Sequence, residues 1–192
     1  AQDNPQVRGL RVIARLLSGR YADAAGDLSS SQLINDPASR LWAGYAGMQA
    51  GHHADAVKDF KFGLRALDQF PPEWRTKIGA AYAYSALQQN DLTTAEAMIG
   101  YALAQAVTPL QKLYAYLIDA QIIEAQGDKP RALKVYQAVA RATDDSIAAP
   151  AAMRAAMLSY DLKKATSAQT LATLDSLRFR WRGDDTEMKL IN

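Results

Sequence analysis

Small and bulky apolar residues recur along the chain in one repeated pattern, separated by polar positions. Four stretches share it, and they begin with turn-forming residues at Gly19, Gly51, Asn90 and Gly127. Each stretch carries an alanine five positions later and a bulky apolar residue four positions after that. The alanines are Ala24, Ala56, Ala95 and Ala132, and the bulky residues are Leu28, Phe60, Ile99 and Tyr136. The four starts are 32, 39 and 37 residues apart, a period typical of stacked helix pairs.

The alanines indicate helical hairpins whose two helices approach closely. Close approach needs a small side chain on both helices, and the positions twelve residues before the small residues are mostly Gly or Ala. These positions are Val12, Gly44, Ala83, Ala120 and Ala156, the last belonging to a fifth, weaker copy in "KKATSAQTLA" with Ala168 as its small residue. A glycine or asparagine at the turn tolerates the left-handed conformation that ends a helix.

The pattern therefore predicts an all-α chain of about five antiparallel helix pairs. First helices are expected near residues 5–17, 37–50, 72–88, 109–126 and 147–161, and second helices near 21–32, 54–69, 92–106, 129–142 and 165–182. The hairpins then span 5–32, 37–69, 72–106, 109–142 and 147–182. Prolines at 37, 71, 72, 109, 130 and 150 suit the first turns of these helices. No linker divides the chain, so a single domain over 1–192 is expected.

Three segments carry a resemblance to the tetratricopeptide repeat (TPR) family: "LWAGYAGMQAGHHADAVKDFKFGL" (41–64), "IGAAYAYSALQQNDLTTAEAMIGYAL" (78–103) and "AQIIEAQGDKPRALKVY" (120–136). The resemblance covers nearly the whole chain, with divergent copies. Trp42 lies closer to Gly44 than the family pattern places it, and the triplet of Ile78, Gly79 and Tyr82 comes about one turn early. The resemblance implies a right-handed superhelical solenoid that binds a protein or peptide.

In this family the first helices line a concave groove where ligands lie. Carried over by position, the resemblance implies a groove formed by Tyr45, Met48, Gln49, Tyr84, Leu87, Gln88, Tyr114, Leu117, Gln121, Glu124, Met153, Met157 and Tyr160. Tyrosine, methionine and amide side chains make an adaptable surface for a peptide or helix. One family variant grips a C-terminal carboxylate with basic and amide residues, but the matching positions hold Gly9, Ile13, Leu41 and Tyr45. That variant is not expected here.

Composition limits the partners and the kinds of site that the chain can have. The net charge is +2 with 22% charged residues, a balance unlike that of a dedicated nucleic-acid binder. Cysteine is absent, which excludes disulfides, thiolate metal sites and a cysteine nucleophile. No apolar run reaches the roughly 20 residues of a membrane span, and "AQDNPQ" lacks the features of a signal peptide.

Residues that could support catalysis or metal binding have simpler interpretations. The adjacent His52 and His53 lack the one-turn spacing of zinc helices and are expected in an exposed turn. Asp144-Asp145 and Asp184-Asp185 are expected to cap helices or face solvent. Arg182-Gly183-Asp184 matches a known adhesion tripeptide, but matches of only three residues occur by chance. We therefore expect no enzyme activity, no cofactor and no metal.

The segment "LRFRWRGDD" (177–185) has two interpretations. Arg178 and Arg182 would share a helix face beside Phe179, an arrangement that can bind bases or an acidic partner. Alternatively, Phe179 and Trp181 seal the last hairpin or pack on a further repeat. The segment also resembles stretches in long exported TPR proteins of alphaproteobacteria, which suggests a piece of a longer, periplasmic protein. A cytoplasmic location is the alternative.

The expected function is a non-catalytic scaffold that binds a protein or peptide partner, in the cell envelope of a bacterium. Two alternatives remain open. One is a helical accessory domain of a larger cell-wall enzyme, and the other is an RNA-binding helical repeat that uses Arg178, Arg180 and Arg182.

Overall fold

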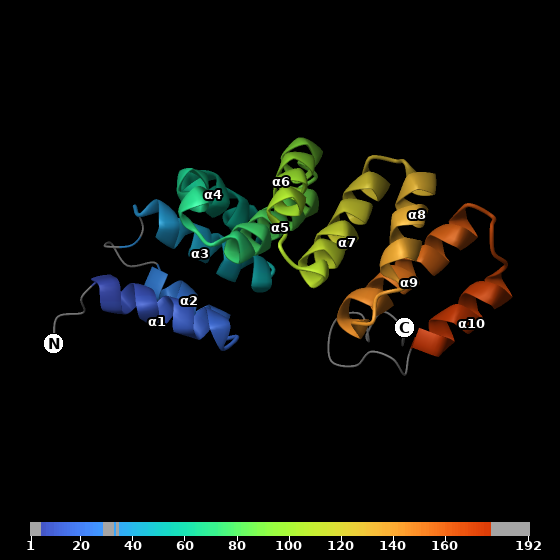
Figure 1. The fold of residues 1–192 in the computed structure, drawn as a ribbon, viewed down its shortest axis with the longest axis horizontal. Coiled ribbons are helices and arrows are strands. Elements are labelled where there is room, and N and C mark those ends of the chain that lie inside the picture. The colour runs from blue at the N-terminus through green and yellow to red at the C-terminus, as the bar shows by residue number, and fades with distance from the viewer. Residues whose placement is uncertain (1–4, 29–32, 34, 178–192) are drawn as a thin grey trace. The chain divides into compact units, whose positions relative to one another are not determined.

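The computed structural model describes residues 5–28, 33 and 35–177, and within these ranges every regular element is helical (Figure 1). The α-helices pack as sequential antiparallel pairs, and one 3₁₀ helix, η1, follows the fourth of them. Their bounds are α1 Pro5–Leu17, α2 Tyr21–Leu28, α3 Pro37–Gln49, α4 His53–Gly63, η1 Leu64–Gln69, α5 Pro72–Gln88, α6 Leu92–Gln105, α7 Pro109–Ala125, α8 Lys129–Val139, α9 Asp145–Asp161 and α10 Ser167–Leu177.

The described helices confirm the all-α class and the helix pairs, with differences at a few ends. The predicted second helix over 54–69 is α4 followed by η1, because the chain tightens into 3₁₀ geometry after Gly63. The η1 segment is held by Arg75, whose guanidinium donates to the carbonyl oxygens of Phe70 (2.6 Å) and Asp68 (2.8 Å). Residues 29–32 and 178–182, which were assigned to second helices, lie outside the described residues.

The turns inside the hairpins repeat one conformation. Gly19, Gly51, Asn90 and Gly127 all have positive φ, between 58° and 92°, which confirms the turn residues read from the sequence. Lys163 has the same conformation at φ 56° and stands five residues before Ala168, so it takes the turn position of the fifth hairpin. A left-handed residue at this point lets the backbone leave one helix and enter the next.

Proline and capping side chains mark the starts of most helices. Pro37, Pro72, Pro109 and Pro130 lie at the first or second helical position, where a missing N–H breaks no intrahelical bond. The expectation for Pro150 is wrong, because it lies inside α9. Asp144 accepts a hydrogen bond from the backbone N–H of Ser146 and so begins the helix at Asp145, two residues earlier than predicted.

Close packing within the hairpins rests on small residues, as expected, but one turn out of the predicted register. The four alanines after the turns are fully buried, and the bulky residues four positions later are buried as well: Ala24, Ala56, Ala95, Ala132, Leu28, Phe60, Ile99 and Tyr136. In the second hairpin Ala56 lies against Gly47, while Gly44 lies under the ring of Phe60. In the fifth hairpin Ala168 is exposed, so its predicted packing role is wrong.

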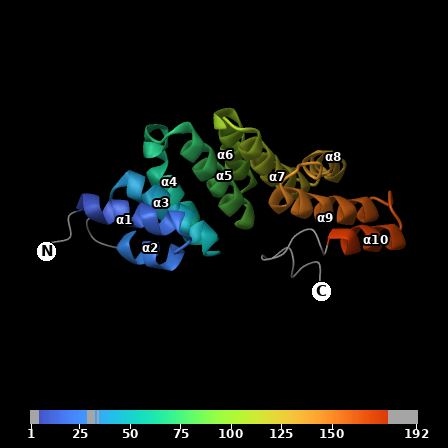
Figure 2. The ribbon, with the colours of Figure 1, turned by 60° about the horizontal axis from the view of Figure 1, so that its bottom comes forward.

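The helices fall into two compact units, Ala1–Val107 and Thr108–Asn192. Within the described residues, the first unit contains three helix pairs, which are α1 with α2, α3 with α4 and α5 with α6. These pairs are joined by contacts of α2 with α3, α4 with α5 and α3 with α5. The second unit contains α7 to α10, each packed on the next in sequence, as α9 and α10 show in Figure 2. The single domain and the superhelical stacking of all five pairs stay predictions.

Each unit has a core in which bulky side chains bridge neighbouring hairpins. In the first unit the ring of Phe60 on α4 stacks on Tyr82 of α5, with centroids 5.2 Å apart. In the second unit Leu117 and Ile123 of α7, Tyr136 of α8 and Leu158 of α9 belong to one buried cluster. Burial of such apolar area, rather than helix propensity alone, stabilises stacked hairpins.

Two glycine substitutions separate close packing from helix propensity. A Cβ on Gly63 would lie 2.6 Å from the carbonyl oxygen of Pro37 and 2.7 Å from Leu41 Cγ. Since backbone cannot yield easily, we expect Gly63→Ala to lower the free energy of unfolding by about 1–3 kcal/mol.

The matched control is Gly100→Ala in α6, where nothing lies within 4 Å of the added Cβ. It should raise stability by about 0.5–1 kcal/mol. Chemical denaturation measures both, and equal effects of the two substitutions would contradict the close approach of α3 and α4.

Candidate functional site

Helix α3 of the first unit carries three of the expected groove residues, and they differ in exposure. Tyr45 is half-buried, its hydroxyl oxygen accepts a hydrogen bond from Gln49 Nε2 (3.2 Å), and burial raises its pKa. Gln49 is exposed, whereas Met48 is buried and cannot contact a ligand without rearrangement. Tyr45 and Gln49 are therefore the surface members of this set.

An aromatic cluster lies beside Tyr45, and sequence reasoning did not assign it to the site. The ring of Trp74 meets the rings of Tyr45 and Trp42 edge-on, with centroids 5.8 Å and 4.6 Å apart. The ring of Trp42 also contacts that of Phe70, with centroids 5.4 Å apart. Lys77 Nζ lies 4.7 Å from the centre of the Trp74 ring. The spacing of Trp42 and Tyr45, three residues apart, could have indicated a shared helix face, but only packing of α3 on α5 brings Trp74 to it.

Further along α5, Tyr84 and Leu87 are half-buried and Gln88 is exposed. Tyr84 meets the ring of His53 edge-on, with centroids 5.4 Å apart. The expectation that both histidines lie in an exposed turn is thus right for His52 and wrong for His53. His53 is the first residue of α4, and its Nδ1 atom is buried without a hydrogen-bond partner. The packing of α4 on α5 carries it into the contact between hairpins.

In the second unit, α7 carries four of the expected residues. Tyr114 is exposed, Gln121 is half-buried and Leu117 is buried in the core cluster. Glu124 belongs to a polar network: its carboxylate accepts from the Tyr136 hydroxyl (2.9 Å) and pairs with Arg154 Nη2 (2.6 Å). The network joins α7, α8 and α9, which gives Glu124 a structural role rather than an open position for a ligand.

Tyr136 is the buried member of this network. Burial raises its pKa strongly, and the negative charge of Glu124 and the hydrogen bond to it raise it further. The hydroxyl therefore stays protonated and donates to the carboxylate. A buried donor with a charged acceptor makes one of the stronger classes of protein hydrogen bond.

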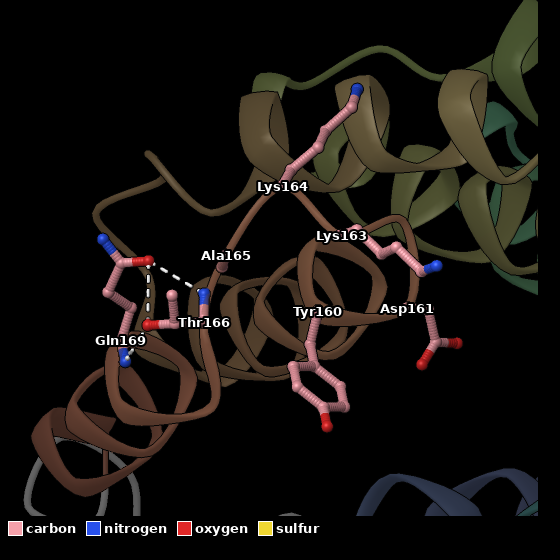
Figure 3. A pocket seen from close by; sticks show the side chains of 7 residues that line it. All are labelled: Tyr160, Asp161, Lys163, Lys164, Ala165, Thr166 and Gln169. Carbon is pink, nitrogen blue, oxygen red and sulfur yellow. Dashed lines mark hydrogen bonds between the residues drawn. The ribbon is translucent and has the colours of Figure 1, made fainter.

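On α9 the expected residues divide in the same way. Met153 is buried, while Met157 and Tyr160 are exposed by 46% and 52%. Tyr160 lines a hollow of about 510 Å³ together with Asp161, Lys163, Lys164, Ala165, Thr166 and Gln169, in which Lys164 points away from Tyr160 (Figure 3). Asp161 pairs with Lys129 of α8 (3.1 Å), and Gln169 and Thr166 cap α10 reciprocally.

The described residues contain no group of three or more His, Asp or Glu side chains placed to hold a metal ion. Asp144 caps α9, as expected for a loop aspartate, and Asp145 is its first residue. The other candidates, Asp184-Asp185, the tripeptide 182–184 and the arginines and aromatics of 178–182, lie outside the described residues. Among the helices that the structure describes, none is long and apolar enough to cross a membrane.

Comparisons with known proteins give no match: no protein-family model, no curated protein and no solved structure is significantly similar to the chain.

Removal of the Tyr136 hydroxyl should cost stability without changing the packing volume. We expect Tyr136→Phe to lower the free energy of unfolding by about 1.5–3 kcal/mol, because the bond to a charged group is lost. Tyr116→Phe is the control, since Tyr116 is 43% exposed, and it should change stability by less than about 0.5 kcal/mol. Equal effects in denaturant titrations would refute a stabilising network.

Protonation of His53 should lower the stability of the folded chain. Burial lowers the pKa of His53 below its usual 6.5, and the charge of His52 lowers it further. The unfolded chain keeps the usual pKa of about 6.5 for this histidine. At a pH between that value and the lowered pKa of the folded chain, the unfolded chain binds a proton that the folded chain does not. The contribution of His53 to stability is therefore full above about pH 6.5 and falls as the pH drops toward the folded pKa.

Proton NMR titration, with assignment through a His52→Gln variant, measures the pKa of His53 directly. The His53→Gln variant should lose less stability than the wild type between pH 7.5 and 5.5. A pKa at or above 6.5 would show that the ring is not desolvated by the contact with Tyr84.

Proposed function

We propose that the chain is a non-catalytic scaffold of the tetratricopeptide type, which binds a peptide or a helix of a partner protein on the first helices of its hairpins. The proposal is supported by the recurrence of one surface position. Tyr45, Tyr84, Gln121 and Met157 each stand six residues before the left-handed turn residue of their hairpin. All four are half-buried or exposed.

The contrast with the preceding residue strengthens this interpretation. At that neighbouring position stand Gly44, Ala83, Ala120 and Ala156, which are small, and the first three are buried. Thus, in the second to fifth hairpins, the first helix carries a small residue followed by a long tyrosine, glutamine or methionine that keeps part of its surface open. Large side chains with an apolar body and few polar atoms can adapt to a peptide surface.

Each unit offers its own set of such side chains. In the first unit the cluster of Tyr45, Trp74 and Lys77 combines aromatic rings with a cation, and Gln49 adds an amide. In the second unit Met157 is exposed on α9, and Tyr160 of the same helix lines the hollow of Figure 3, whose lining side chains are largely exposed. Open surfaces of this kind suit a segment that lies along helices, as in helix-in-groove recognition.

Site-specific crosslinking in the source cells tests the proposal. A photoreactive phenylalanine analogue would replace Tyr84 on α5 or Met157 on α9, with Ala97 on α6 and Lys134 on α8 as matched exposed positions on second helices. We expect a discrete protein adduct from positions 84 and 157 and none from 97 and 134. Met157→Glu should abolish capture of that protein from envelope or cytoplasmic fractions.

Two results would argue against binding by the first helices. One is an adduct of equal yield from the control positions. The other is unchanged capture by both Met157→Glu and Tyr84→Ala, with both variants folded as judged by circular dichroism.

A further inference from the structure

An exposed phenylalanine on the second hairpin lies close to two arginines. Phe62 of α4 is 43% exposed. The guanidinium carbon of Arg40, on α3, lies 5.5 Å from the centre of its ring, and that of Arg65, on η1, lies at the same distance. Phe62 is not one of the buried core residues, so its contacts with two cations call for a different explanation.

The charges around this ring are only partly neutralised. Arg40 pairs with Asp59 (2.7 Å) and Lys58 pairs with Asp55 (2.9 Å). Arg65 and Lys61 are both exposed, and within the described part of the chain neither forms an ion pair. The charge of Lys61 reaches Asp91, whose pKa it helps to lower without contact. Among the described residues, Arg65 thus offers a charge without an ion pair at the open aromatic ring, and the exposed Lys61 lies four residues before it in the sequence.

Stacking on the ring prepares the guanidinium group of Arg65 for an anionic ligand, whereas that of Arg40 already pairs with Asp59. A guanidinium that lies over an aromatic face keeps its N–H donors free at its edge, and it loses less conformational freedom on binding than an unrestrained side chain. Those donors match the geometry of a carboxylate, which can accept two of them at once. The ring itself offers an apolar contact between the charges.

We propose that Phe62, together with Arg40, Lys61 and Arg65, forms a docking site for an acidic peptide segment of a partner protein. Carboxylates of the segment pair with Arg65 and Lys61, and an apolar side chain between them packs on Phe62. Phe62, Lys61 and Arg65 belong to the second helix of the hairpin and to η1, and Arg40 of α3 is not among the first-helix residues proposed above, so the site does not depend on that surface.

The interleaved acids favour a peptide over a nucleic acid. Asp55 and Asp59 lie one turn apart on the same helix that carries Lys58 and Lys61. Their carboxylates would repel a continuous phosphate backbone, which needs an uninterrupted positive track. A peptide with separated glutamates can place each charge beside a cation and avoid the acids.

Titration of the full ¹⁵N-labelled chain with the synthetic peptide acetyl-Glu-Glu-Leu-Glu-Glu-amide tests the site. We expect amide shifts centred on residues 61–65, with affinity measured by fluorescence anisotropy of a labelled copy. Arg65→Glu should weaken binding about tenfold or more, and Phe62→Ala several-fold. Arg141→Glu, which makes the same charge change at an exposed position of the second unit, should change the affinity less than about twofold.

Several outcomes would overturn the proposal. Equal weakening by Arg65→Glu and Arg141→Glu would mean general electrostatic attraction only. Absence of shifts at 61–65 at millimolar peptide would remove the site. Tighter, Arg65-dependent binding of a ten-nucleotide polyuridine would assign the surface to nucleic acid instead. Unchanged circular dichroism spectra of the variants keep each of these results interpretable.

Discussion

The close approach of the two helices in each hairpin is the constraint on which the rest of the structure depends. The hairpin turns carry a left-handed residue, and a glycine or alanine stands where the helices meet in all but the first hairpin, which has Val12 there. In the second hairpin Gly51 supplies the turn, and Gly44 and Gly47 leave room for Phe60 and Ala56. Bringing the helices together at this level buries the bulky residue one turn later, so that the contact is both tight and apolar.

The same geometry connects one hairpin to the next. In the first unit the bulky residue of the second hairpin reaches the following first helix, since Phe60 of α4 stacks on Tyr82 of α5. The last hairpin departs from this arrangement. Lys163 replaces glycine at the turn, Ala168 is exposed and only Leu177 of α10 is buried. Its second helix accordingly has little of the apolar packing that fixes the others.

Polar and aromatic residues outside this framework serve two different purposes. The network of Glu124, Tyr136 and Arg154 joins three helices and is satisfied internally, so it stabilises the second unit and leaves little for a ligand. Tyr45 with Trp74, Met157 with Tyr160, and Phe62 with Arg65 keep part of their surface open. The division follows from position: residues facing a neighbouring helix become structural, and residues one position away meet solvent.

The sequence by itself determined the helix pairs, their turns and most of their boundaries, because these depend on local chemistry. Each of these signals affects only the backbone within a few residues of its own position. They are a glycine or asparagine at a turn, a proline or aspartate at a helix start, and an alanine at a fixed spacing from the turn. Only the tertiary structure decided which surface residues are open. Met48, Leu117 and Glu124 share helix faces with exposed neighbours, and packing of the adjacent hairpin buries or pairs them. Likewise His53 meets Tyr84, and Trp74 meets Tyr45, across 31 and 29 residues of chain, distances over which sequence periodicity carries no information about contact.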